Sequence, residues 1–402
     1  MLSVGIDVSK GISTVCMLRP NEKPVMPPTE IVHSEASLEV FCQKLHSFNE
    51  ELRVVMEATG AYHLPILKKL KEHGFFVSVI NPLLMKKYSA TTIRKAKTDK
   101  IDSIKIANYG IDNWFKLIEY QPTAEIYEEL RYLGRQYAHY IKIKVESKLS
   151  LTSILDRTMP GIKALLKSTN VDNPAKDKLC DFVERYWHYD NITKLSEDEF
   201  ICDYCKWAKE KRYAASTTKA KAIYQMAQAG IPTLSSSASS TKMLSLEAVR
   251  VLNEINKTLS IILTEMRKLA ITLPEYDTVL AMNGVGAVLS LMLIAEIGDV
   301  NRFRNGSALV AYAGLDAPPF ESGKFVGTKR SISKRGSSLL RKIGYVIMKC
   351  LKSVKPKEDA AVYDFMIKKE QEGKPSKVAK IAALNKFLRI YHARVKEVYS
   401  LA

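Results

Sequence analysis

The sequence predicts an α/β domain over residues 1–118, a region of long helices over 119–272 and a mainly helical domain over 273–402. Short β-rich runs alternate with helical patterns near the N-terminus, and apolar residues recur at helical spacing through the middle. The last third opens on a glycine turn that leads into an apolar helix. With 402 residues, 46% of them hydrophobic, the chain is expected to hold more than one core, because single domains stop growing near roughly 250 residues.

The first 118 residues contain five β-rich runs separated by turns and helical patterns. Helices are expected from Ser37 and over LPILKKLKEHG, which ends in a glycine typical of a helix C-terminus. The runs that predict strands are VGIDV at 4–8, STVCML at 13–18, EIVHS at 30–34, RVVMEAT at 53–59 and FFVSVINP at 75–82. This order predicts an α/β domain with a sheet at its centre.

Two long helices are expected in the middle region. Their apolar residues alternate at spacings of three and four: Ile126, Leu130, Leu133, Tyr137 and Tyr140 in the first, and Leu252, Ile255, Leu259, Ile262, Met266 and Leu269 in the second. Two interpretations are open: the helices pack on each other as an internal hairpin, or they form a coiled coil that joins protomers, which we favour. The stretch from about 160 to 240 is polar and irregular, ends in the linker-like SSSASST, and is expected to be an insertion.

The glycine turn of the last third lies in NGVGAVLSLMLIAEIGD at 283–299. Its Gly284 and Gly286 resemble the hairpin of a helix-hairpin-helix element, in which backbone N–H groups meet a phosphate. Glycine turns before helices are common, so the motif by itself is weak.

The charge balance predicts a polyanionic partner. The chain has 61 Lys and Arg against 43 Asp and Glu, a net charge of +18, which favours nucleic acid. No run approaches the roughly 18 apolar residues of a membrane-spanning helix, so we expect a cytoplasmic protein without membrane contact. The six cysteines do not suggest a disulfide framework. Cys202 and Cys205 have zinc-ligand spacing, but without a second such pair ordinary thiols are favoured.

Four acidic residues are candidates for a metal site. Asp7 and Glu57 each end an apolar run, where side chains border the ligand-binding edge of an α/β sheet. Asp99 and Asp102 are three apart in an expected helix and share one face. Four clustered carboxylates would suit Mg²⁺, or Mn²⁺, and two such ions stabilise phosphoryl displacement. The alternative gives each acid its own role in a turn, a helix start or a solvated helix face.

Between Leu84 and Lys105, basic residues surround just two acids and would lead a phosphate backbone to the carboxylates. They are Lys86, Lys87, Arg94, Lys95, Lys97, Lys100 and Lys105. A second basic segment follows FESG and contains Lys324, Lys329, Arg330, Lys334, Arg335, Arg341 and Lys342. Ser322, which lies in FESG just before this segment, is either a nucleophile or a polar residue of a basic loop. A serine hydroxyl needs activation, and no histidine lies nearby in sequence.

Motifs from both ends of the chain together resemble one family. At the N-terminal end these are GIDVSK at 5–10, EATGAY at 57–62, VSVINP at 77–82 and KTDKIDSIKIA at 97–107. At the C-terminal end these are NGVGAVLSLMLIAEIGDVNRF at 283–303, LVAYAGLDAPPFESG at 309–323 and SISKRGSSLLRK at 331–342. In this order they resemble the IS-one-ten family of insertion-sequence transposases. Only the middle of the chain is unassigned.

This resemblance implies a ribonuclease-H-like (RuvC-like) fold for the first domain. It implies a DEDD metal-binding tetrad at Asp7, Glu57, Asp99 and Asp102, and at Ser322 the serine that becomes linked to DNA phosphate. It also implies DNA recombination by a homo-oligomer, a dimer or tetramer, guided by a structured noncoding RNA in the bacterial or archaeal cytoplasm, at the nucleoid when acting. The two prolines before Phe320 depart from the family pattern.

Three alternatives remain open from the sequence. A metal-dependent RuvC-like endonuclease would use the same acids and release free ends, with no covalent intermediate. GIDVS alone would also suit an actin-like or sugar-kinase-like phosphotransferase, but no second glycine-rich phosphate loop follows and the net charge of +18 argues against it. A non-enzymatic nucleic-acid-binding protein would act through its basic segments alone.

Overall fold

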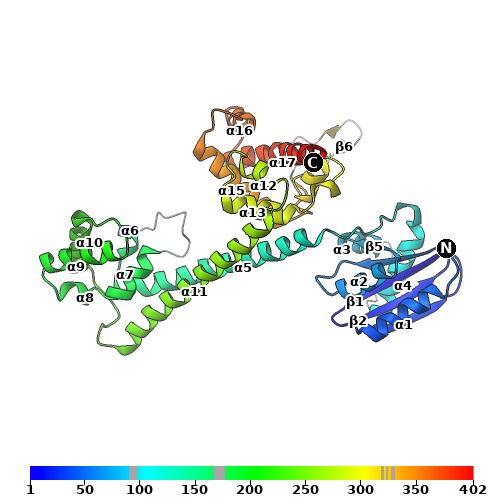
Figure 1. Ribbon diagram of the computed structural model, residues 1–402, viewed down its shortest axis with the longest axis horizontal. Coiled ribbons are helices and arrows are strands. Elements are labelled where there is room, and N and C mark those ends of the chain that lie inside the picture. The colour runs from blue at the N-terminus through cyan, green and yellow to red at the C-terminus, as the bar shows by residue number, and fades with distance from the viewer. Residues whose placement is uncertain (90–97, 167–176, 318–320, 323–324, 327–330, 402) are drawn as a thin grey trace. The chain divides into compact units, whose positions relative to one another are not determined.

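The computed structural model describes residues 1–402 except for 90–97, 167–176, 318–320, 323–324, 327–330 and 402. The chain divides into two compact units, Met1–Pro122 and Thr123–Ala402, which are coloured blue to cyan and cyan to red in Figure 1. Each unit has a hydrophobic core of its own. Among the described residues, no helix has the length and apolar character needed to cross a membrane.

The first unit contains one sheet and four α-helices among its described residues. The strands are β1 (Leu2–Ser9), β2 (Ile12–Leu18), β3 (Met26–Val32), β4 (Leu52–Glu57) and β5 (Phe76–Ile80). The helices are α1 (Glu35–His46), α2 (Leu64–Glu72), α3 (Pro82–Ser89) and α4 (Asp99–Asp112), followed by the 3₁₀ turn η1 (Trp114–Lys116). The predicted α/β domain with a central sheet is therefore confirmed.

The five strands lie in the order β3-β2-β1-β4-β5. The first three form an antiparallel meander, whereas β4 pairs parallel to β1 and β5 pairs parallel to β4. Parallel neighbours require crossover connections, which α1 and α2 supply here. The C-terminal ends of β1, β4 and β5 consequently lie at one edge of the sheet.

Helices cover both faces of this sheet. Val4 and Ile6 of β1 pack in one core with Leu38 of α1 and Ile66 of α2. On the opposite face, Val55 of β4 packs in a separate cluster that includes residues of α3 and α4. The unit is thus a three-layer arrangement in which α4 lies on the face that α1 and α2 leave open.

The second unit is helical apart from one small hairpin in its described part. Its first helices are α5 (Glu125–Thr158), α6 (Ile162–Leu165), α7 (Lys178–Tyr186), α8 (Asp190–Thr193), α9 (Glu197–Glu210), α10 (Thr217–Ala229) and α11 (Ser239–Ala270). Next come α12 (Tyr276–Leu280), α13 (Ala287–Ile297), η2 (Val300–Arg302) and α14 (Gly306–Tyr312). The hairpin of β6 (Glu321–Ser322) and β7 (Phe325–Val326) precedes α15 (Ser338–Val354), α16 (Ala361–Gln371) and α17 (Ser376–Leu401).

The two long helices expected in the middle region are α5 and α11, and they pack against each other within the chain. Tyr127 near the start of α5 shares a core with Met266 near the end of α11. Leu155 near the end of α5 shares a second core with Val249 in the first half of α11. The helices therefore run antiparallel, as Figure 1 shows. Of the two interpretations left open by the sequence, this arrangement is the internal hairpin. A contact between protomers stays a prediction.

The expectation of irregular structure between residues 160 and 240 is wrong. Its described residues form helices α6 to α10 with a buried aromatic core. Its members include Phe182, Tyr186, Phe200, Tyr204 and Trp207, whose rings contact one another. A few large rings bury enough apolar area to hold short helices together although most surrounding residues are polar. That sparse pattern concealed the helical periodicity.

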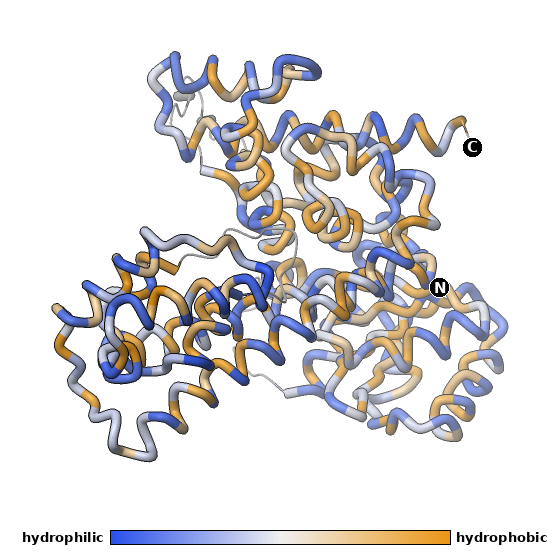
Figure 2. The backbone as a smooth tube through the Cα atoms, turned by 60° about the vertical axis from the view of Figure 1, so that its left-hand side comes forward, coloured by the Kyte–Doolittle hydropathy of each residue, from blue (hydrophilic) through white to orange (hydrophobic). Residues whose placement is uncertain are grey.

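The C-terminal helices pack around α13. Its residues Ser290 to Ile297 are all buried, so this part of the helix has no solvent-exposed side. Apolar and polar residues alternate along many of the chain's other helices (Figure 2). Helices α15 and α17 and the adjoining ends of α5 and α11 contribute to the same core. This core supports the segment that carries Ser322.

Candidate active site

Asp7 and Glu57 lie on neighbouring strands at the same level of the sheet. The parallel register of β1 and β4 pairs Val4 with Val54 and Ile6 with Met56, so Asp7 and Glu57 are the next residues in step. Adjacent strands are about 4.8 Å apart. The two acids predicted from separate apolar runs therefore stand side by side at the C-terminal edge of the sheet.

Both acids belong to the face of the sheet that α4 covers. Val4, Ile6 and Met56 lie in the core beneath α1 and α2, and side chains alternate between faces along a strand. Asp7 and Glu57 are out of phase with these residues and share their face with Gly5 and Val55. Each acid is half-buried. The sheet thus presents two carboxylates on one face.

Helix α4 runs antiparallel to β1 and brings its first turn toward Asp7. A Cβ on Gly110 would meet Ser3, whereas a Cβ on Gly5 would meet Ser103 and Ala107. The Ser3 hydroxyl also donates to the Ala107 carbonyl at 2.8 Å. From Gly5 to Asp7 the strand advances roughly 6.6 Å, and from Ser103 back to Asp99 the helix advances roughly 6 Å. The start of α4 therefore reaches the level of Asp7.

The first turn of α4 carries Asp99 and Asp102. Thr98 caps the helix, its side chain accepting from the Ile101 N–H at 3.3 Å. Asp99 is exposed, and the Asp102 carboxylate pairs with the Lys105 ammonium at 3.0 Å. Carboxylates at a helix N-terminus are stabilised by the helix dipole. Strand register thus places Asp7 and Glu57 at the C-terminal edge of the sheet, and the antiparallel run of α4 directs the turn with Asp99 and Asp102 toward the same edge.

Carboxylate oxygens at this edge have the chemistry that a hard divalent cation prefers. The side chains do not close into a coordination shell, however. Across the described ranges, no group of three or more His, Cys, Asp or Glu side chains lies close enough together to hold a metal ion. The donor set fits such an ion, whereas the metal-binding role of the four acids stays a prediction.

The basic residues predicted near the acids begin on α3, where Lys86 and Lys87 are exposed. Arg94, Lys95 and Lys97 lie outside the described residues. Tyr88 packs edge-on against Tyr109, and its hydroxyl donates to Asp112 at 2.5 Å. Tyr88 therefore joins α3 to α4, which fits the structural role favoured from sequence over base stacking.

Ser322 lies in a two-stranded hairpin. Its backbone in β6 pairs with Phe325 of β7, and Glu321 pairs with Val326. The predicted nucleic-acid contacts Lys324, Lys329 and Arg330 lie outside the described residues. Lys334, Arg335 and Lys342 are exposed. Arg341 instead donates through Nη1 to the carbonyls of Ala313 at 2.9 Å and Gly336 at 3.1 Å.

The other motifs noted in the sequence occupy separate places. The turn with Gly284 and Gly286 joins α12 to α13 and borders a cavity of about 780 Å³ with α11 and α15. Cys202 is exposed on α9, Cys205 is partly buried there, and the described cysteines are all free thiols. Neither feature is shown to bind a ligand.

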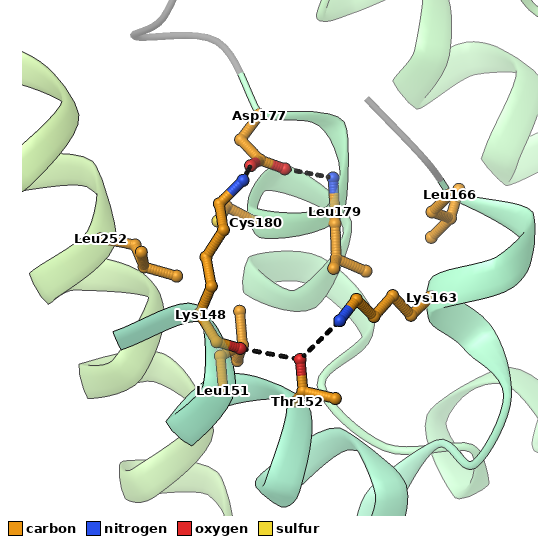
Figure 3. Close-up of a pocket in the computed structure, with 9 residues that line it drawn as sticks. All are labelled: Lys148, Leu151, Thr152, Lys163, Leu166, Asp177, Leu179, Cys180 and Leu252. Carbon is orange, nitrogen blue, oxygen red and sulfur yellow. Dashed lines mark hydrogen bonds and ion pairs between the residues drawn. The ribbon is translucent and has the colours of Figure 1, made fainter. Parts of the chain in front are cut away.

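A smaller cavity of about 280 Å³ lies beside α5 and α7 (Figure 3). Lys148 pairs with Asp177 at 3.1 Å, and Lys163 donates to Thr152 at 3.1 Å. The Asp177 side chain also caps α7 by accepting from the Leu179 N–H at 3.1 Å. Because these polar groups satisfy one another, we interpret them as links between helices.

Sequence reasoning did not assign Gly5 a part in the site, although a glycine inside a strand indicates close approach of another backbone. It also did not connect Lys105 with Asp102, although a spacing of three in a helix places them on one face. Both signals were present in the sequence. Their relevance depends on where α4 lies.

Two family models match the chain. Residues 4–160 match a family described as "Transposase", and residues 276–364 match the "Transposase IS116/IS110/IS902 family". The first match contains all four acids, and the second contains Ser322. The two matches have the same order along the chain as the motifs of the predicted resemblance.

The chain is also similar over nearly its whole length to two curated proteins. The "Pilin gene-inverting protein" of Moraxella lacunata is 23% identical over 394 residues, which cover 98% of this chain and 95% of the relative. The protein of that name from Moraxella bovis is 22% identical over the same length, with the same coverage.

Two solved structures match a short part of the chain. One is "Thermus thermophilus RuvC structure", at 14% identity and a TM-score of 0.24; the other is "T. thermophilus RuvC in complex with Holliday junction substrate", at 13% and 0.23. Each covers 29% of this chain and 96% of the matched chain. At such TM-scores they add nothing to the architecture derived from the strands.

The chain joins an α/β unit, with acids at one edge of its sheet, to a helical second unit. Transposase models match both ends of the chain, which defines an enzyme that recombines DNA. The chain is a DNA transposase or recombinase. It belongs to the IS116/IS110/IS902 family of insertion-sequence transposases, which confirms the predicted resemblance.

Proposed function

We propose that this transposase cuts and rejoins DNA strands through Ser322, with a divalent cation held by Asp7, Glu57, Asp99 and Asp102. In this proposal the first unit is a ribonuclease-H-like (RuvC-like) catalytic domain. The observation that carries it is the adjacency of Asp7 and Glu57 in the β1–β4 register, on the face where α4 brings its first turn. The placement of Asp99 and Asp102 in that first turn further supports the proposal.

The four acids would bind the cation from two elements of the first unit. Asp7 and Glu57 would hold it from the sheet, and Asp99 and Asp102 from α4. When bound, Mg²⁺ or Mn²⁺ would neutralise charge that develops on the phosphate. Lys105 offsets the charge of Asp102 and keeps its carboxylate at the start of the helix.

Ser322 would act as the nucleophile. Its Oγ attacks the phosphorus of a phosphodiester, a serine–phosphate bond forms, and the bond to the 3′ oxygen breaks. The serine proton passes to solvent, and the departing 3′ oxygen takes up a proton. A 3′ hydroxyl of another strand reverses these steps, which restores the serine and rejoins DNA without ATP. The relatives named for gene inversion support rejoining over digestion, because inversion of a DNA segment requires that strands are cut and then rejoined.

The partners in this proposal are DNA, a structured guide RNA and further copies of the chain. Exposed Lys334, Arg335 and Lys342 support contact with phosphates. In a guided enzyme base pairing selects the sequence, so the protein needs no base-reading element. Tyr132, Val145 and Leu149 of α5 are 67%, 54% and 63% exposed, which supports a contact between protomers in a dimer or tetramer.

Covalent trapping tests the serine assignment. Protein, Mg²⁺, element-end DNA and the flanking noncoding RNA are incubated, quenched in denaturant and examined for a protease-sensitive shift of the DNA. We expect a shift with wild type and with Ser331→Ala, an exposed serine of the same segment, but none with Ser322→Ala. An adduct that persists in Ser322→Ala contradicts the assignment. Cleavage without any adduct favours the second candidate, a metal-dependent nuclease.

Omission of the RNA tests the guide. We expect adduct formation only with the matching RNA, and a retargeted RNA is expected to move the reaction to the DNA that it pairs with. Equal activity without RNA would remove guidance from the proposal and leave the serine chemistry intact. Light scattering of the purified protein, with and without nucleic acid, measures the number of protomers.

A further inference from the structure

The segment that carries Ser322 begins and ends at the same place in the fold. Asp316 precedes it and Ser333 follows it, so Ser322 lies six positions after one and eleven positions before the other. The Ser333 N–H donates to the Asp316 carbonyl at 2.7 Å, and the Ser333 hydroxyl donates to the Asp316 carboxylate at 2.5 Å. Backbone and side chain thus join the same two residues.

Ser333 has a second contact that fixes its side chain. Its Oγ accepts from the Arg335 N–H at 3.3 Å while it donates to Asp316. A hydroxyl has one proton and two lone pairs, so this pattern uses it as donor and acceptor together. Ser333 therefore contacts the chain before the hairpin, at Asp316, and the chain after it, at Arg335. We call residues 312–316 and 333–337, where the two ends of the segment meet, the junction.

The chain on either side of this pair is held by backbone contacts. The Lys334 N–H donates to the Gly314 carbonyl at 3.0 Å, and the Ser337 N–H donates to the Tyr312 carbonyl at 2.8 Å. Gly314 and Gly336 approach so closely that a Cβ on Gly336 would lie 2.5 Å from the Gly314 nitrogen. The junction therefore requires glycine at this crossing.

The junction is anchored to the buried core. Ser337 caps α15 and donates its hydroxyl to Glu296, a carboxylate only 3% exposed at the end of α13. Arg341 of α15 donates to the carbonyls of Ala313 and Gly336, on opposite sides of the crossing. Contacts from Glu296 outward to Asp316 therefore connect the apolar helix α13 with the base of the Ser322 segment.

We propose that Asp316 and Ser333 are positioning residues for Ser322: their paired hydrogen bonds fix the base of its hairpin relative to α13 and α15. The proposal rests on the proposed role of Ser322 as nucleophile. Joining the two ends of a segment reduces the conformations open to the chain between them. Attack in line with the leaving oxygen requires this restriction, because reacting atoms must be held at roughly 3–3.5 Å.

The test compares Ser333→Ala with Ser333→Thr and with Ser331→Ala. Threonine keeps the hydroxyl that bonds Asp316, whereas Ser331 is an exposed serine outside the junction. We measure the single-turnover rate of covalent adduct formation, DNA affinity, the thermal midpoint, and hydrogen exchange of the β6 and β7 amides. In Ser333→Ala we expect the adduct rate to fall roughly 10- to 100-fold and exchange in the hairpin to quicken. DNA affinity is expected to stay unchanged, and Ser333→Thr is expected to restore both rate and protection.

The other possible results each contradict the positioning role or the nucleophile assignment. Wild-type rate and exchange in Ser333→Ala overturn the proposal, as does faster exchange with an unchanged rate. Asp316→Ala breaks the same bond from the other side and replaces Ser333→Ala if that variant does not fold. Failure of both to fold makes the pair a folding element and overturns a positioning role. Absence of adduct in wild type overturns the nucleophile assignment itself, while the exchange data still show whether the pair restrains the hairpin.

Discussion

A Cβ atom placed on Gly5 of β1 would lie 2.7 Å from the Cα of Ala107 in α4, and closer still to neighbouring backbone atoms. Real Cβ contacts do not occur at such distances, and the atoms in the way belong to the helix backbone, which has no flexible end to move. Gly5 therefore sets how closely α4 lies on the sheet. Because α4 carries Asp99 and Asp102 toward Asp7, this close packing also sets the spacing of the four acids.

Gly5→Ala is expected to push α4 away from β1 and to separate the acids. Overpacking against backbone costs up to about 3 kcal/mol, so the free energy of unfolding and the DNA-cleavage rate should both fall. Urea unfolding and a cleavage assay measure them. Gly286→Ala is the matched control, because a Cβ there meets open space at an ordinary φ of −90°. Equal stability of the two variants would contradict this account of α4.

Asp102→Asn is expected to remove strand cleavage, whereas Asp112→Asn on the same helix should preserve it. Asp112 bonds Tyr88 on α3, and an asparagine oxygen still accepts from that hydroxyl. In the proposal Asp102 helps to hold the cation that stabilises charge on the phosphate, and loss of such stabilisation costs roughly 10²-fold or more in rate. Cleavage rates at several Mg²⁺ concentrations provide the comparison. Full activity in Asp102→Asn would remove that residue from the proposed site.

Arg341 and Lys342 are adjacent in sequence but are expected to respond differently to substitution. Arg341→Ala removes bonds to two backbone carbonyls and should lower the thermal midpoint. Lys342 is exposed, so Lys342→Ala should leave the thermal midpoint unchanged. It should reduce the slope of log affinity for DNA against log salt concentration by about one. Thermal unfolding and affinities over a range of salt concentrations separate the two effects. An unchanged thermal midpoint and a weaker salt dependence in Arg341→Ala would instead make Arg341 a phosphate contact.

His63 is expected to make the protein less stable in mildly acidic solution. Burial lowers the pKa of His63 below its usual 6.5 and outweighs the opposite effect of the backbone at Thr59 and Gly60. As pH falls through 6.5 the unfolded state binds a proton first, so the free energy of unfolding decreases. His63→Phe replaces the imidazole with an aromatic ring that does not bind a proton. The free energy of unfolding of this variant should therefore fall less between pH 7.5 and 5.5 than that of wild type. Parallel pH curves for the two proteins would contradict this.

Much of the first unit could be predicted from local patterns. The β-rich runs give β1 to β5, because strand residues alternate between two faces and the runs end in turn residues. The N-cap Thr98 and the spacing of Asp99 and Asp102 are also local, since a helix repeats every 3.6 residues. Asp7 and Glu57 were found because both follow buried runs, and the β1–β4 register places them side by side.

The helices between residues 160 and 240 could not be predicted in the same way. Their core depends on Phe182, Tyr204 and Trp207, which are far apart in sequence and meet only when α7 and α9 pack together. The pairing of α5 with α11 posed a different difficulty. An apolar stripe on a helix requires a partner but does not say whether that partner lies in the same chain.

The sequence by itself determined the α/β start and the two long helices, and it pointed to the four acids and the serine that the proposal uses, because these depend on residue type and short spacing. It also determined the family, through motifs at both ends. Tertiary structure alone decided that α4 covers the face of Asp7 and Glu57, that α5 packs on α11, and that Asp316 meets Ser333. These contacts join residues far apart in the chain, and they form only where backbones such as those at Gly5 and Gly336 approach without an intervening side chain.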